Sequence, residues 1–173
     1  GYIMNRSKKL AILSHCILNQ NSVVKGEYKD INTFLPFVKN LFENNIGILQ
    51  LPCPETEYYG LKRWGHVKDQ FCNVGYKKYI ENKINDFVDI IKEYINNGYE
   101  IIGVYGIAGS PSCGVNLTCS GNIGGEIGKY KDLEEINSKI KMINESGVFM
   151  ETFKIILEEN NININFYDVN DYL

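Results

Sequence analysis

The chain has 173 residues, 44% hydrophobic and 23% charged, which is enough apolar material to bury the core of one domain. Its net charge of −3 argues against a nucleic-acid partner, because phosphate binding needs clustered lysine and arginine. No apolar run approaches the roughly 18 residues of a membrane span, and residues 1–10 lack the apolar segment of a signal peptide. We therefore expect a cytoplasmic protein without a membrane partner, whose five cysteines do not form a disulfide framework.

Strands and helices are predicted to alternate along the chain. Residues 9–14 form a short apolar run typical of a buried strand, and residues 33–42 show helical spacing with Pro36 in the first turn. The later predicted elements are a strand at 48–51, a helix at 76–94, a strand at 100–106, a helix at 148–158 and a strand at 162–166. This alternation predicts an α/β fold, with a Rossmann-like or flavodoxin-like parallel sheet and helices on both faces.

Residues 115–146 interrupt the alternation. The segment is rich in Gly, Asn, Ser and Thr up to Gly128 and is charged afterwards. We expect a Gly-rich insertion after the third strand, built as a loop or hairpin plus a short helix, that acts as a lid over a site. Residues 1–173 are accordingly predicted to form a single α/β domain with this insertion at 115–146.

Three cysteines come directly after three of the predicted strands: Cys16, Cys53 and Cys113. The carboxyl ends of parallel strands share one edge of a sheet, and that edge holds the ligand site in such folds. We therefore expect the three thiols to converge, although each taken alone could be a buried apolar filler. Three thiolates suit a soft metal or an iron–sulfur cluster. A structural zinc would want four ligands, usually from paired CxxC motifs that this chain lacks.

At these cysteines the sequence resembles a known family, the thiouracil desulfidases (TudS-like proteins). The resemblance lies in three motifs that occur in the same order: Ser14-His15-Cys16, Cys53-Pro54-Glu55, and Ser-Pro-Ser-Cys-Gly at residues 110–114. It implies a 4Fe–4S cluster held by the three cysteines with one open iron. It also implies a non-redox reaction in which sulfur is removed from a small thiocarbonyl compound such as 2-thiouracil.

The resemblance further implies that a carboxylate and a hydroxyl move the protons, and by position these are Glu55 and Ser112. The open iron would bind the thiocarbonyl sulfur while water attacks the carbon. The segments after Cys16 and after Glu55 depart from the family pattern, which leaves the identity of the thiocarbonyl substrate open. Glu55 could instead be an ordinary helix N-terminal carboxylate, and Ser112 could cap a turn.

Further residues could contact a substrate or the cluster. Ser14 belongs to the first motif, His15 could orient a substrate or simply be packed, and Asn19 could contact a heterocycle or form a turn. Tyr59 and Trp64 could form an aromatic wall for a flat ring or pack in a loop. Ser110 could donate a hydrogen bond to a cluster sulfur or form the turn before proline.

Two other functions compete with a desulfidase. One is a protein that binds an iron–sulfur cluster or a metal, handles sulfur or iron or senses redox state, and has no desulfidase activity. Cys72 or Cys119 as a fourth ligand would favour that function. The other is a flavodoxin-like nucleotide binder with incidental cysteines. The sequence does not indicate an oligomeric state.

Overall fold

Four parallel strands form the central sheet of the computed structural model, which describes residues 5–173. Strand β1 (Lys9–Leu13) lies between β2 (Gly47–Gln50) and β3 (Glu100–Gly106), and β6 (Phe166–Asp168) pairs with the far side of β3. The order β2-β1-β3-β6 is that of a flavodoxin-like sheet. The predicted α/β fold with a parallel sheet is thus confirmed. The structure does not describe residues 1–4, which belong to the segment 1–10 for which no signal peptide is predicted.

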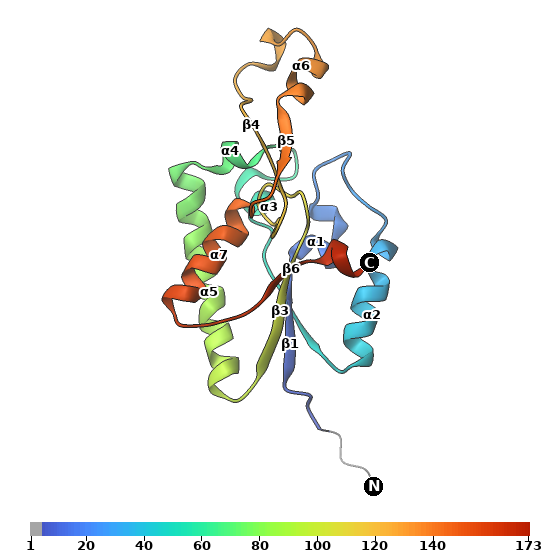
Figure 1. Ribbon diagram of the computed structural model, residues 1–173, viewed down its shortest axis with the longest axis vertical. Helices are drawn as coiled ribbons and strands as arrows, with labels where there is room; N and C mark the ends of the chain where they lie inside the picture. Colours follow the sequence, from blue (N-terminus) through green and yellow to red (C-terminus); the bar gives the residue numbers. More distant parts are fainter. Residues whose placement is uncertain (1–4) are drawn as a thin grey trace.

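Helices cover both faces of this sheet, as Figure 1 shows. Helices α5 (Val74–Asn96) and α7 (Val148–Glu159) lie on one face, and α2 (Leu35–Glu43) lies on the other. The inward side of α5 is made by apolar residues three or four positions apart, namely Tyr76, Ile80, Ile84, Val88 and Ile91. Among residues 5–173, no helix combines the length and the apolar character that a bilayer crossing requires.

The strands divide their side chains between two hydrophobic clusters. Ile12 and Val104 point into the cluster with α5 and α7, whereas Ala11, Leu13 and Tyr105 point into the cluster with α2. This alternation follows from the two-residue period of a strand. Because both faces are buried, the strands read in the sequence as continuous apolar runs.

The carboxyl edge of the sheet carries short elements that the periodicity did not predict. These are α1 (His15–Leu18), α3 (Pro54–Tyr59) and α4 (Lys68–Phe71), which are too short to show an amphipathic repeat. Single 3-10 turns occur at Gln20–Ser22, Ile31–Thr33, Ile127–Lys129 and Val169–Tyr172.

The last strand of the sheet begins later in the chain than the sequence predicts. Residues 162–166 alternate apolar and polar side chains, but the paired strand is β6, at Phe166–Asp168. Ile162 and Ile164 do pack against the core, which explains the alternation. Backbone pairing begins only where the Val104 amide donates to the Asn165 carbonyl at 2.9 Å.

The insertion after β3 contains an antiparallel hairpin of β4 (Thr118–Gly121) and β5 (Ile140–Ile143), with α6 (Leu133–Ser138) between them. It projects beyond the carboxyl edge of the sheet (Figure 1). Its base is fixed to α4, because the Asp69 carboxylate accepts from Ser120 Oγ at 2.7 Å and from the Gly121 amide at 2.9 Å. The hairpin and short helix are as expected, and its action as a lid stays a prediction.

A buried carboxylate on β6 holds the chain that follows β3. Asp168 is 3% exposed and accepts from the Val115 amide at 2.8 Å and the Asn116 amide at 2.9 Å. Asn170 similarly accepts from the Ala108 amide at 2.9 Å. The loop that follows β3 is therefore held at both ends, near Ala108 by Asn170 and near Val115 by Asp168.

We expect Asp168→Ala to lower the free energy of unfolding by about 3 kcal/mol, because two buried amides lose a charged acceptor. Urea unfolding followed by circular dichroism measures this change. Asp171→Ala, at an exposed position nearby, is the matched control and should change the value by less than about 0.5 kcal/mol. Equal effects of the two substitutions would contradict the assigned role of Asp168.

Candidate functional site

The carboxyl ends of β1, β2 and β3 are level with one another. Leu13, the last residue of β1, is in register with Gln50 and with Tyr105. Cys16 lies on α1 just beyond the end of β1, and Cys53 is the N-cap residue of α3 just beyond β2. Two of the three predicted cysteines therefore stand at the same height above the sheet.

Cys113 reaches the same edge through a loop that folds back on β3. The Cys113 carbonyl accepts from the Ile107 amide at 2.9 Å, and a Cβ atom on Gly106 would lie only 2.2 Å from that carbonyl oxygen. Ser110 Oγ accepts from the Cys113 amide at 3.0 Å. The amide of Phe149, in the first turn of α7, donates to the Ser112 carbonyl at 2.9 Å. Glycine and proline at these positions thus permit a tight turn that presents the Cys113 side chain.

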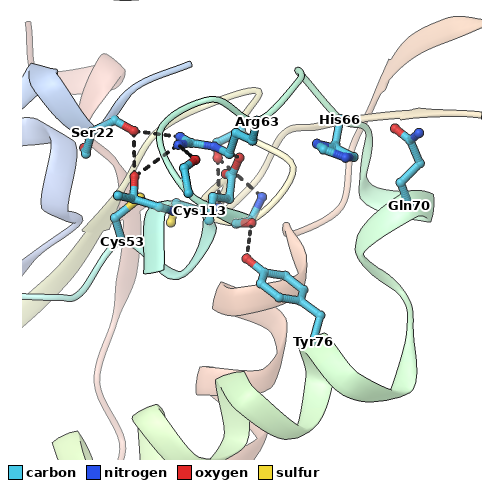
Figure 2. Close-up of polar contacts among 12 residues, drawn as sticks. Ser22, Cys53, Arg63, His66, Gln70, Tyr76 and Cys113 are labelled. Atoms are coloured by element: carbon cyan, nitrogen blue, oxygen red, sulfur yellow. Dashed lines mark hydrogen bonds and ion pairs between the residues drawn. The ribbon is translucent and has the colours of Figure 1, made fainter. Parts of the chain in front are cut away.

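The three thiols line one cavity of about 490 Å³. Burial, then the neighbouring Cys53, raises the pKa of Cys16 to about 12. Burial, then Cys16 and Cys53, raises the pKa of Cys113 well above its usual value. Cys16 and Cys113 therefore both lie close to Cys53, and Figure 2 shows Cys53 and Cys113 in the same corner of the site.

The cavity can be compared with the geometry that a metal ion or a cluster requires. Within residues 5–173, no three His, Cys, Asp or Glu side chains are grouped closely enough to surround one ion. The irons of a cubane lie apart from one another, so its cysteine ligands are spread around a space. In addition, the buried hydroxyl of Ser14 has no hydrogen-bond partner in the described part of the chain and approaches the Cys113 sulfur. It could donate to a sulfur bound there.

Glu55 lies in the first turn of α3 and lines the same cavity. It is 9% exposed, and burial raises the pKa of its carboxyl above the ordinary range, with the Arg63 charge and the Ser112 hydroxyl acting in the opposite direction. The helix N-terminus alone would have lowered this pKa. The carboxyl group of Glu55 therefore holds a proton closer to neutral pH than an exposed glutamate does.

Arg63 is a site residue that the sequence did not single out. Its side chain is 3% exposed, lines the cavity, and places Nε 3.5 Å from Glu55 Oε1. Its terminal nitrogens donate to the Ser22 carbonyl at 2.6 Å, to Thr56 Oγ1 at 3.1 Å and to the Gly60 carbonyl at 3.1 Å, as Figure 2 shows in part. Lys62-Arg63 looks like an exposed basic pair in the sequence, so only the fold reveals this buried cation.

Ser112 is fully buried behind the cavity wall, and its hydroxyl lies 3.0 Å from the Tyr76 hydroxyl. It is also close enough to Glu55 to lower the pKa of that carboxyl. Tyr76 comes from α5, and the sequence assigned it no role beyond the start of the helix predicted at 76–94. The side chains of Ser112, Tyr76 and Glu55 thus form a buried polar group beside the cysteines, and Tyr76 is labelled in Figure 2.

Among the other predicted contact residues, His15 and Ser110 line the cavity and Asn19 does not. His15 Nδ1 lies 3.1 Å from the Leu51 carbonyl, and Nε2 lies 3.1 Å from Asn19 Nδ2. These bonds fit a neutral ring with its proton on Nδ1, since a carbonyl can only accept. Asn19 thus supports His15 rather than facing the cavity.

Tyr59 and Trp64 do not line the cavity. Trp64 is 74% exposed, because its loop turns the indole outward. Tyr59 packs in an aromatic cluster, with ring centroids 5.4 Å from Phe71 and 5.2 Å from Tyr76. The structure therefore brings together Cys16, Cys53, Cys113, Glu55, Ser14, His15, Ser110 and Ser112, and it leaves Tyr59, Trp64 and Asn19 outside the cavity lining.

Cys119, which the sequence offered as a possible fourth ligand, and His66, to which it assigned no role, also line the cavity. Cys119 comes from β4 of the hairpin, and its thiol donates to the His66 carbonyl at 3.6 Å. Cys72 is exposed and lies on a different cavity, between α5 and α7. Four of the five thiols therefore belong to one site.

The comparisons with known proteins place the chain in a family. It is 36% identical over 138 residues to the "Uncharacterized protein MJ0003" of Methanocaldococcus jannaschii, a match that covers 80% of this chain and 86% of that protein. No family model matches the sequence. No solved structure matches it either. The chain therefore belongs to the same family as this archaeal protein.

We expect the metal-free protein to react with iodoacetamide fastest at Cys72, the exposed thiol. At pH 8 a thiol with a pKa of about 12 is almost entirely protonated, so Cys16 should react on the order of 10³-fold more slowly than a typical exposed thiol. Peptide mass spectrometry over a time course measures both rates. Alkylation of Cys16 as fast as Cys72 would contradict the raised pKa of Cys16.

We also expect Glu55→Gln to stabilise the protein at neutral pH and to have little effect at acidic pH. Because burial raises the pKa of Glu55, the unfolded chain loses this proton first, and stability falls as pH rises through the ordinary glutamate range until the folded pKa is passed. Urea unfolding at a series of pH values measures the difference between variant and wild type. Glu134→Gln, at an exposed position, is the matched control for the substitution itself.

Proposed function

We propose that this protein is an iron–sulfur-dependent desulfidase that removes sulfur from a small thiocarbonyl compound without net redox change. The observation that carries the proposal is that three strand-end thiols and the buried carboxyl of Glu55 line one cavity. The resemblance of the three cysteine motifs to the thiouracil desulfidases supports the same function. Five free cysteines suit a reducing compartment such as the cytoplasm.

Cys16, Cys53 and Cys113 would hold the cluster, and Ser14 would donate a hydrogen bond to one of its sulfurs. When bound, a 4Fe–4S cluster with three protein ligands supplies an open, Lewis-acidic iron that can accept the sulfur of a thiocarbonyl. The cavity of about 490 Å³ leaves room for a small heterocycle beside such a group.

The protein's own residues would handle the protons of the hydrolysis. The overall change is C=S plus water to C=O plus hydrogen sulfide. Glu55 takes a proton from the attacking water, and its raised pKa lets it return the proton to the leaving sulfur. Arg63 holds the Glu55 carboxylate in place, while Tyr76 and Glu55 orient the Ser112 hydroxyl.

A second candidate function is favoured by the position of Cys119. This thiol lines the same cavity as the three predicted ligands and could serve as a fourth ligand to the cluster. A cluster with four cysteine ligands has no open iron, and it would suit a redox sensor or an iron- or sulfur-handling protein. Iron content and activity of the cysteine variants distinguish the two functions.

We expect the anaerobically purified protein to bind about four irons and to release sulfide from 2-thiouracil or a related thioamide. Serine substitution of Cys16, Cys53 or Cys113 should abolish iron binding, whereas Glu55→Gln should keep the iron and lower sulfide release by about 10²- to 10⁴-fold. Iron analysis, visible absorption and sulfide determination provide the measurements.

Cys72→Ser and Cys119→Ser are the matched controls, and both should keep the iron. Loss of iron in Cys119→Ser would favour the four-ligand function over the desulfidase. A fully loaded protein that is inert toward every thiocarbonyl tested would refute the proposed activity.

A further inference from the structure

Three buried side-chain polar atoms in the described part of the chain lack a hydrogen-bond partner: Ser14 Oγ, Arg63 Nε and His66 Nδ1. All three belong to the candidate site, since Arg63 and His66 line its cavity and Ser14 approaches the Cys113 sulfur. Buried polar groups are normally paired, so unpaired ones gathered at a cavity indicate groups that a ligand satisfies.

Two of these atoms already lie near a group that can accept a hydrogen bond from them. Ser14 faces the Cys113 sulfur, and Arg63 Nε lies 3.5 Å from the Glu55 carboxylate. The imidazole of His66 differs, because its Nδ1 is buried and has no hydrogen-bond partner of good geometry among residues 5–173. Even with the Trp64 backbone nearby, the ring keeps one nitrogen for a molecule in the cavity.

The His66 ring is held firmly in this position. Its centroid lies 5.3 Å from that of Tyr59 and 4.9 Å from that of Phe71, with the rings tilted by about 30°. Neither aromatic ring lines the cavity, so both support the imidazole from behind. The His66 carbonyl accepts from the Cys119 thiol, which ties the loop to the hairpin. Figure 2 shows His66 beyond Arg63, from the same loop.

The surroundings favour an uncharged imidazole. Burial lowers the pKa of His66, a hydrogen bond with the Trp64 backbone acts in the opposite direction, and the nearby Arg63 charge lowers it further. None of the ion pairs among residues 5–173 involves this ring. An uncharged imidazole has one nitrogen that accepts a hydrogen bond. Glu55 is engaged with Arg63, and His66 is a further acceptor in the lining of this largely apolar cavity.

We propose that His66 accepts a hydrogen bond from an N–H group of the substrate. The site would thereby select thiocarbonyl compounds whose carbon is flanked by N–H, such as cyclic thioureas and thioamides, over their N-alkylated analogues. The thiocarbonyl part of this inference rests on the proposed function. A site that presents a buried acceptor discriminates against analogues that leave it unpaired.

The test compares matched probes with and without N–H groups. Isothermal titration calorimetry measures binding of 2-thiouracil and 1,3-dimethyl-2-thiouracil to the metal-free protein, and of the unreactive uracil and 1,3-dimethyluracil to the iron-loaded protein. Variants are His66→Phe, which keeps a ring against Tyr59 and Phe71, and His66→Asn, which restores a side-chain acceptor. Cys72→Ser lies outside the cavity and should bind each probe as the wild type does. Thermal melting confirms that each variant folds.

Wild type should prefer each N–H probe by about tenfold, as expected for one hydrogen bond. His66→Phe should abolish the preference by weakening only the N–H probe, and His66→Asn should retain part of it. Equal binding of both probes by wild type, binding of neither, or an unchanged preference in His66→Phe would overturn the proposal. If the preference depends on His66 but the loaded protein releases no sulfide, the desulfidase proposal fails and the N–H recognition stands.

Discussion

The alignment of three strand ends is the constraint on which the candidate site depends. The Leu13 carbonyl accepts from the Leu51 amide at 2.8 Å, and the Ser14 amide donates to the Tyr105 carbonyl at 3.0 Å. These two bonds hold the residues after β1 between the ends of its neighbours. Cys16 and Cys53 therefore reach the same space from adjacent strands, and the folded-back loop after β3 adds Cys113. A cysteine at the opposite edge could not join them.

A second constraint is the burial of opposite charges beside the thiols. Glu55 and Arg63 are both largely removed from water, and removing Arg63 would take away the positive charge that offsets part of the cost of burying the Glu55 carboxylate. Arg63 also binds carbonyls of two separate segments, at Ser22 and Gly60, so it joins the loop after α1 to the end of α3. The same side chain thus positions a carboxyl group and closes one wall of the cavity.

The sequence predicted those features that arise from long periodic segments and from strand order. The parallel sheet, α5, α7 and the convergence of the strand-end cysteines follow from such patterns, and the structure agrees with them. Single side chains that reach the site from other elements were missed, namely Arg63, Tyr76 and His66, and so was Asp168, which anchors the loop after β3. Nothing local marks these residues, because a buried arginine or tyrosine has the same sequence context as an exposed one. Trp64 shows the converse, since an aromatic near the motif points outward.

The clamp formed by Asp168 has a consequence for the order in which the protein is made. The amides of Val115 and Asn116 find their acceptor only on β6, which is synthesised after the whole hairpin insertion and α7. While the chain is emerging from the ribosome, the loop with Cys113 lacks this anchor, although Cys16 and Cys53 are already present. The loop that presents Cys113 therefore gains this anchor only after β6 has been synthesised and has joined the sheet.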